Sequence, residues 1–113
     1  MQLEMTDLGN AAKVALHGRL DTPGVDQIET RFTASVVAGG RNALVDLSAV
    51  TFVSSMGIRM LLTAARSLGV KGAKMVLVGE QPLERESFEH VVLPDTIPIA
   101  ADDAQALELL RTA

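Results

Sequence analysis

Apolar and polar residues follow two different periods along this chain, and each period predicts a different kind of element. Large apolar residues occupy alternate positions at Leu3 and Met5 and again at Val14 and Leu16, and Gly9-Asn10 lies between the two runs. This pattern predicts a β-hairpin, because successive side chains of a strand point to opposite faces. Two later segments, 43–47 and 73–78, are almost continuously apolar, which predicts buried strands in a sheet covered on at least one face by helices.

Other segments have apolar residues every three or four positions, which is typical of helices. Such spacing runs from Val25 to Val37 and from Ile58 to Leu68. Pro82 suits the first turn of a third helix, which we expect to extend to about His90. Asp102 or Asp103 is expected to cap a fourth helix near the C-terminus.

The order of these elements predicts the fold class. Residues 96–99 add a short last strand, placed at the sheet edge because Pro98 lacks an N–H donor. Alternating strands and helices in the middle of the chain imply right-handed crossovers and parallel neighbouring strands. We therefore expect an α/β fold, one domain over residues 1–113. It should have a mixed central sheet of about four to five strands with about four helices packed on it.

Composition narrows the classes of function. The chain has 113 residues, a net charge of −4 and no cysteine. An acidic chain with only three aromatic residues does not predict a nucleic-acid partner, and the absence of cysteine excludes thiol chemistry. The sequence has no apolar run of the ~18 residues that a membrane span needs, and its N-terminus lacks the apolar core of a signal peptide. We expect a cytoplasmic protein without direct membrane insertion.

The sequence offers no convincing catalytic apparatus. Its two histidines, His17 and His90, stand apart from any nucleophile or metal-ligand spacing. The glycines of 69–74 lack the Gly-Lys-Ser/Thr ending of a phosphate-binding loop, and the carboxylates are scattered. We therefore expect no catalytic residue, no metal and no cofactor, and a protein that is not an enzyme.

Two adjacent serines, Ser54 and Ser55, precede the helical pattern that begins at Ile58. Serine is among the best N-cap residues, so capping alone accounts for one of them. A helix N-terminus also accommodates negative charge, so either serine could receive a phosphate. The pattern itself leaves both interpretations open.

The helix after the serines is predicted to present a contact surface. We place the apolar stripe of this helix between Ile58 and Leu61, at 100° per residue. The opposite, outer face of the helix then points to solvent, and Arg59 lies beside that face. Methionines on an outer face suit an adaptable protein contact, although single exposed methionines are also common. A phosphate beside that surface would oppose an apolar interface. The residues placed on the outer face are Met56, Met60, Thr63 and Ser67.

Three segments together resemble a known family. They are His17-Gly-Arg-Leu-Asp-Thr22, the strand at 43–48, and Val50-Thr-Phe-Val-Ser-Ser-Met-Gly-Ile-Arg-Met-Leu-Leu62. In this order they resemble the STAS domain, and more closely the bacterial anti-sigma factor antagonists (anti-anti-sigma factors). The likeness covers nearly the whole chain.

The resemblance implies a partner switch. Unphosphorylated members bind an anti-sigma factor, usually a serine kinase with an ATPase domain of the histidine-kinase-like fold. The kinase phosphorylates a serine at the start of this helix, and a PP2C-type phosphatase removes the phosphate. We expect a monomer or weak dimer. The alternative is a non-phosphorylated STAS scaffold or an accessory subunit of a transporter.

The family motif commonly reads Asp-Ser-Ser-Gly or Ser-Ser-Ala-Gly, and matching its glycine to Gly57 implies the site residues. Ser55 then takes the place of the phosphoacceptor, with Ser54 as the less favoured alternative. Ser54 stands where Asp is frequent, and Met56 stands where a small residue is usual. Helix face and resemblance together predict a partner-binding surface of Asp21, Thr22, Ser54, Met56, Gly57, Arg59, Met60 and Thr63.

Overall fold

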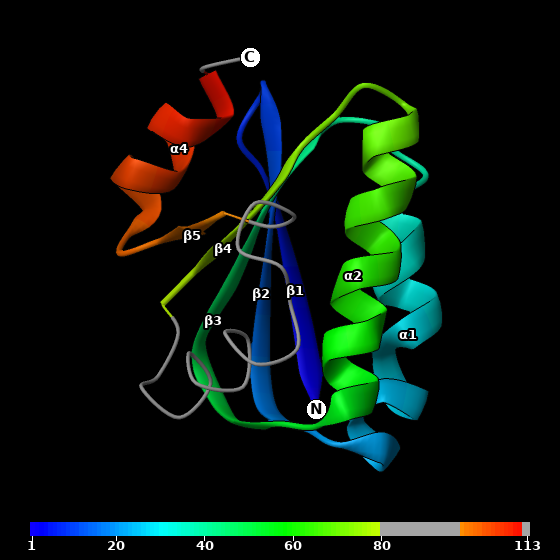
Figure 1. Cartoon of the computed structure of the whole chain (residues 1–113). Helices are drawn as coiled ribbons and strands as arrows, with labels where there is room; N and C mark the ends of the chain where they lie inside the picture. Colours follow the sequence, from blue (N-terminus) through cyan, green and yellow to red (C-terminus); the bar gives the residue numbers. More distant parts are fainter. Residues whose placement is uncertain (80–97, 112–113) are drawn as a thin grey trace.

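A five-stranded mixed sheet runs through the middle of the molecule, with helices on both of its faces (Figure 1). The computed structural model describes residues 1–79 and 98–111. The helix expected from Pro82 to about His90 lies outside the described residues. The described elements are β1 (Gln2–Asp7), β2 (Ala11–Leu20), α1 (Thr22–Val36), β3 (Asn42–Val53), α2 (Ser55–Val70), β4 (Met75–Val78), β5 (Ile99–Ala100) and α4 (Asp103–Arg111).

The strands lie in the order in which they occur in the chain, β1-β2-β3-β4-β5. β1 and β2 are antiparallel, as the hairpin pattern predicts, and every other neighbouring pair is parallel. The α/β class, the mixed sheet and the strand number are thereby confirmed. β3 is longer than the predicted segment 43–47, because exposed polar residues such as Ser48 and Thr51 interrupt its apolar run without ending the strand.

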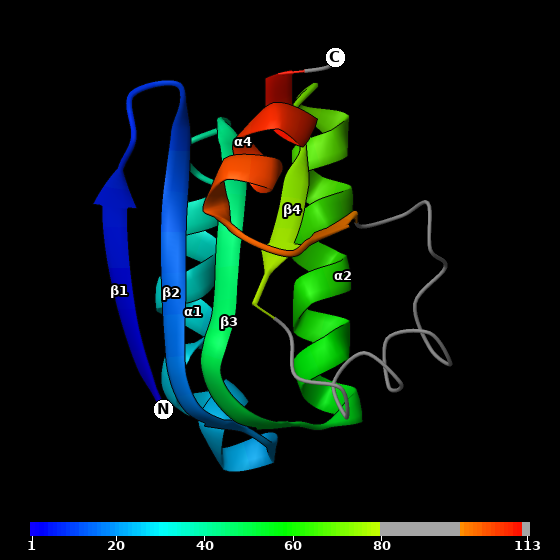
Figure 2. The same cartoon turned by 90° about the vertical axis from the view of Figure 1, so that its left-hand side faces the viewer.

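Alternating side chains of the central strands feed two separate cores. In β3, Val45 packs on the side of α1 and α2, whereas Leu44 belongs to the core beneath α4. In β4, Leu77 likewise packs on the side of α1 and α2, and Val76 belongs to the core beneath α4. Figure 2 shows α1 and α2 behind the sheet and α4 on its other face. Burial on both faces explains why these strands read as continuous apolar runs.

The C-terminal helix α4 is attached to the sheet by polar contacts as well as by its core. Asp102 caps it, accepting the Gln105 N–H at 2.8 Å, which settles the choice between the two adjacent aspartates. Lys13 on β2 donates to Asp103 Oδ2 at 2.6 Å and lies 3.7 Å from Asp46 Oδ2. The hydrogen bond with Asp103 raises the pKa of Lys13, so the ammonium stays charged. α4 is thus fixed on the face opposite α1 and α2.

Candidate partner-binding site at the start of α2

Ser54 is the N-cap of α2 and is bonded in three ways. Its Oγ accepts the Gly57 N–H at 3.2 Å and donates to the carbonyl oxygen of Leu20 at 3.0 Å. Its backbone N–H donates to the same Leu20 oxygen at 2.9 Å. The Ser54 hydroxyl therefore ties α2 to the end of β2, and it is half-buried.

Ser55, one residue later, is in a different environment. It is the first residue of α2 and is exposed. Its hydroxyl makes no hydrogen bond with any residue in the described part of the chain. Of the two adjacent serines, Ser54 therefore supplies the cap and Ser55 presents an accessible hydroxyl at the positive end of the helix.

Gly57 allows the first turn of α2 to approach the end of β2. A Cβ atom at this position would lie 2.7 Å from Leu20 Cγ and 2.8 Å from the Leu20 carbonyl oxygen. Both separations are shorter than real Cβ contacts, so only glycine fits without a shift of the backbone. Gly57 is buried, so its role is to position the helix start and not to contact a partner directly.

Asp21 has the same role in α1 that Ser54 has in α2. Its Oδ1 accepts the Gly24 N–H at 2.9 Å, and Arg19 Nε donates to its Oδ2 at 3.2 Å. The bond from Gly24 is the main reason why the pKa of Asp21 lies below its usual range, and Arg19 lowers it further. Thr22 follows as the exposed first residue of α1. Both helices thus begin at the carboxyl ends of adjacent parallel strands, at the same end of the sheet.

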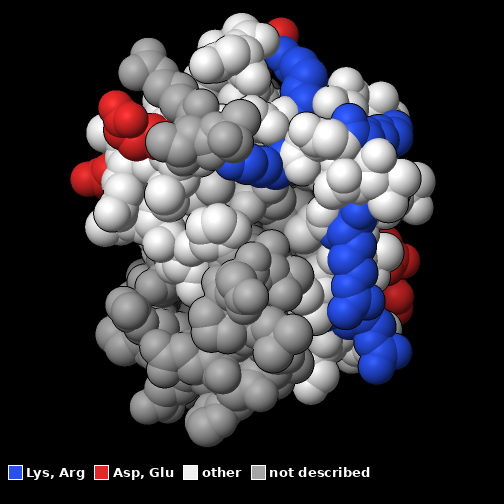
Figure 3. Space-filling model, turned by 45° about the horizontal axis from the view of Figure 1, so that its top comes forward, with Lys and Arg blue, Asp and Glu red and all other residues white. Residues whose placement is uncertain are grey.

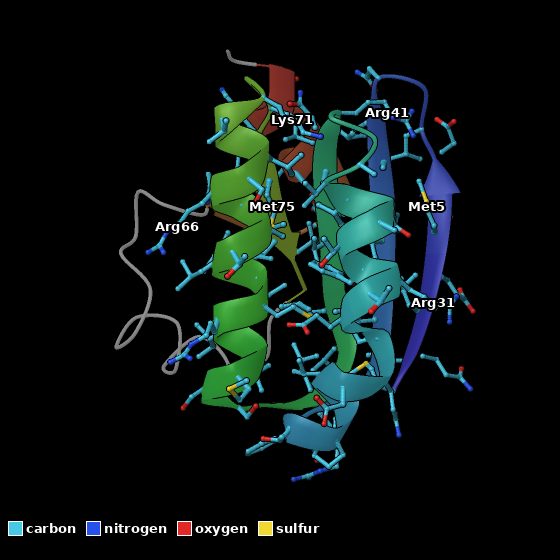
Figure 4. The ribbon with its side chains drawn as sticks, turned by 90° about the vertical axis from the view of Figure 1, so that its right-hand side faces the viewer. Met5, Arg31, Arg41, Arg66, Lys71 and Met75 are labelled. Atoms are coloured by element: carbon cyan, nitrogen blue, oxygen red, sulfur yellow. The ribbon has the colours of Figure 1, made fainter. Side chains whose placement is uncertain are left out.

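Met60 does not belong to the exposed face, and its predicted place there is wrong. Its exposed fraction is 5%, and it is part of the core shared with α1 and the sheet. α2 packs beside α1 as well as against the sheet (Figure 4), so its buried sector is wider than one sheet-facing stripe and includes Ala64. Met56, in contrast, is 40% exposed.

The exposed face of α2 carries a basic hollow of about 300 Å³. Arg59 and Thr63 lie exposed there as predicted. Figure 4 shows Arg66 pointing to the side of α2 away from α1, and Figure 3 shows Lys and Arg side chains gathered along one side of the molecule. The hollow is lined by Ser55, Ile58, Arg59, Leu62, Thr63 and Arg66.

Sequence reasoning missed two further features, one beside the start of α1 and one on α2. The Arg19 guanidinium, which is hydrogen-bonded to Asp21, lies over the ring of Phe52, 4.5 Å from its centroid. Arg66 was also missed, although it lies seven residues, about two helical turns, beyond Arg59. That spacing was the available signal for Arg66. The Arg19–Phe52 contact depends on the register of β2 against β3, which sequence alone does not reveal.

Within residues 1–79 and 98–111 no group of three or more His, Asp or Glu side chains is arranged to hold a metal ion. No helix in the same ranges is long and apolar enough to cross a membrane. The functional groups exposed near the start of α2 are the hydroxyl of Ser55, the thioether of Met56 and the guanidinium of Arg59.

This arrangement is a small α/β fold with two capped helix starts at one end of its sheet. The chain belongs to the STAS domain family, whose family model matches residues 2–106. The family membership expected from the serine–glycine segment and the Gly-Arg-Leu-Asp segment is thereby confirmed.

Individual relatives cover almost the full length of the chain. BtrV of Bordetella bronchiseptica, named as an anti-sigma factor antagonist, is 28% identical over 113 residues, which are 100% of this chain and 97% of BtrV. The crystal structure of an anti-sigma factor antagonist from Mycobacterium paratuberculosis has a TM-score of 0.86 and 25% identity, covering 97% of this chain and 93% of that one. The phosphorylated form of the Bacillus cell fate determinant SpoIIAA shares the fold, with a TM-score of 0.71, 19% identity and coverage of 97% and 100%.

Proposed function

We propose that this chain is an anti-sigma factor antagonist that switches partners through phosphorylation of Ser55. The unphosphorylated form binds an anti-sigma factor that is also a serine kinase, and phosphorylation releases it. A PP2C-type phosphatase restores the binding form. The names of BtrV and of the mycobacterial protein support the antagonist role. The chain acts as a binding protein and a kinase substrate, and not as an enzyme.

The different exposure and hydrogen bonding of the two serine hydroxyls are the reason for proposing Ser55 as the phosphate acceptor. A kinase needs a hydroxyl that can reach the γ-phosphate of ATP, and the exposed Ser55 Oγ meets that need. The Ser54 Oγ would have to leave both Leu20 and Gly57, which would uncap α2. In the transfer, Ser55 Oγ forms the new bond to phosphorus, the bond to the ADP oxygen breaks, and the hydroxyl proton passes to a base of the kinase.

A phosphate at Ser55 would change the surface without disturbing the fold. It adds about −1.5 to −2 charges at the N-terminus of α2, where the helix dipole favours anions. An interface that covers Met56 and the adjoining apolar part of the hollow would have to desolvate that charge. An unpaired buried charge is costly, so the complex weakens while the domain stays folded.

Phosphate incorporation by the cognate kinase tests this proposal. We expect one phosphate per chain by intact-mass spectrometry, located at Ser55 by fragmentation and absent from Ser55→Ala. Ser54→Asn is the matched control, because asparagine keeps the N-cap while removing the other hydroxyl. Phosphate on Ser54, or undiminished phosphorylation of Ser55→Ala, would refute the assignment.

A further inference from the structure

The charges of α2 differ from those of the chain as a whole. The chain carries a net charge of −4, yet α2 contains two arginines and no Asp or Glu. Both arginines, Arg59 and Arg66, are exposed and line the same hollow. Neither lies within ion-pair distance of a carboxylate among the residues that the structure describes. The helix therefore holds two cations in a hollow without neutralising anions among those residues.

Arg59 lies one turn beyond Ser55 on the same side of the helix. Residues separated by four positions are surface neighbours, with Cβ atoms about 5–6 Å apart. Both side chains line the hollow, so a group extending from Ser55 Oγ enters the space that the Arg59 guanidinium borders. Arg66 borders the same hollow but lies eleven residues from Ser55, about 16 Å along the helix axis.

We infer that Arg59 is a built-in receptor for the phosphate of Ser55, holding it against α2 within the same chain. A planar guanidinium can bind two phosphate oxygens at once, which makes it the preferred partner of this group. The inference rests on the proposed phosphorylation of Ser55 and names how the modified site is stabilised.

The start of α2 completes the coordination. The N–H of Gly57 is taken by the Ser54 hydroxyl, and that of Ile58 by the Ser54 carbonyl at 3.0 Å. The N–H groups of Ser55 and Met56 have no acceptor among the described residues. A phosphate on Ser55 thus meets unpaired donors on the backbone side and the Arg59 guanidinium on the hollow side.

This contact gives one modification two effects on the surface. Phosphorylation adds an anion beside Met56, and it also engages the cation at Arg59 that the unmodified protein offers to a partner. The surface changes from basic to acidic within a single helical turn. A partner that uses carboxylates to bind Arg59 therefore loses an attraction and meets a repulsion.

The test uses the full chain with phosphoserine installed at position 55 during translation, so that it does not depend on any kinase. Phosphorus NMR then follows the second ionisation of the phosphate, whose ordinary pKa is about 6. We expect Arg59→Gln to raise this pKa by about half a unit, because a neighbouring cation favours the dianion. Arg59→Lys should restore part of the difference. Circular dichroism verifies that each variant is folded.

Arg66→Gln is the matched control, since it removes the same charge from the same hollow at a greater distance. It should shift the phosphate pKa by much less than Arg59→Gln. An unchanged pKa in Arg59→Gln, or equal shifts in the two variants, would overturn the inference. Either result leaves the kinase assay on Ser55 unaffected, so failure here is distinct from failure of the proposed function.

Discussion

The Ser54 hydroxyl donates to the carbonyl oxygen of Leu20 at 3.0 Å, across the 34 residues that separate them in sequence. The same oxygen accepts the Ser54 N–H, so one backbone carbonyl at the end of β2 fixes the residue that caps α2. The Ser54 hydroxyl therefore has a structural role, as the N-cap of α2 and as a link between α2 and β2. Its neighbour Ser55 is exposed at the first helical position.

Ser54→Ala should destabilise the domain by about 1 kcal/mol, the usual cost of losing a helix N-cap. The Gly57 N–H would lose its acceptor, although the Leu20 carbonyl would keep its bond from the Ser54 N–H. Urea unfolding followed by circular dichroism measures the change. Ser55→Ala, which removes an exposed hydroxyl, should stay within about 0.5 kcal/mol of the wild type. Equal losses in both variants would contradict the division of roles.

Gly57→Ala should destabilise by about 1–3 kcal/mol, because the new methyl group would meet Leu20 at distances that force a shift. Gly69→Ala is the matched control in the same helix. A Cβ at Gly69 would have nothing within 4 Å, so the higher helix propensity of alanine should leave stability unchanged or raise it by up to about 1 kcal/mol. Thermal unfolding of the two variants compares them directly. A neutral Gly57→Ala would show that α2 need not approach β2 so closely.

Met60→Ala should cost about 2–5 kcal/mol, as expected for truncating a buried methionine. Met56→Ala should cost less than about 0.5 kcal/mol, because Met56 is exposed. The effect on binding should be different: Met56→Ala should weaken the complex with the anti-sigma factor although the stability of the domain is unchanged. Denaturant unfolding together with calorimetric titration separates the two effects. If Met60→Ala kept normal stability and lost only binding, the result would contradict the buried position of Met60.

The stability of the domain should fall at acid pH, partly through Asp21. Its pKa is lower in the folded state than the usual 3.8, so ionised Asp21 stabilises the fold above that value, and the contribution disappears as pH falls through the folded-state pKa. Asp21→Asn keeps a good N-cap without the charge. Its deficit in unfolding free energy should therefore be largest near about pH 6 and shrink toward about pH 2. A deficit that is constant over this range would contradict a charge-dependent role for Asp21.

The sequence predicted the described strands and helices because its signals are local. The Gly9-Asn10 turn, the buried runs of β3 and β4 and the helical spacing after Ser55 each predict an element on their own. The prediction failed at Met60, since its burial depends on how α2 lies against α1. A single period of 3.6 residues locates one buried stripe but does not show that a second neighbour widens it.

Which of the two serines caps α2 was shown only by the structure. Both are good N-caps by composition, and only the position of the Leu20 carbonyl shows which one is bonded. The same holds for Arg19 and Phe52, whose contact is made by pairing two strands distant in sequence. The family resemblance pointed to Ser55 on its own grounds, and the geometry supports that choice by a separate argument.

We expect a phosphate on Ser55 to switch binding off while leaving the domain folded. The decisive measurement is calorimetric titration of the anti-sigma factor with chain carrying phosphoserine at position 55, set beside unmodified chain and Ser55→Ala. We predict at least about tenfold weaker binding of the phosphorylated chain, native circular dichroism, and near-normal affinity for Ser55→Ala. Equal affinities of the phosphorylated and unmodified chains would contradict the account.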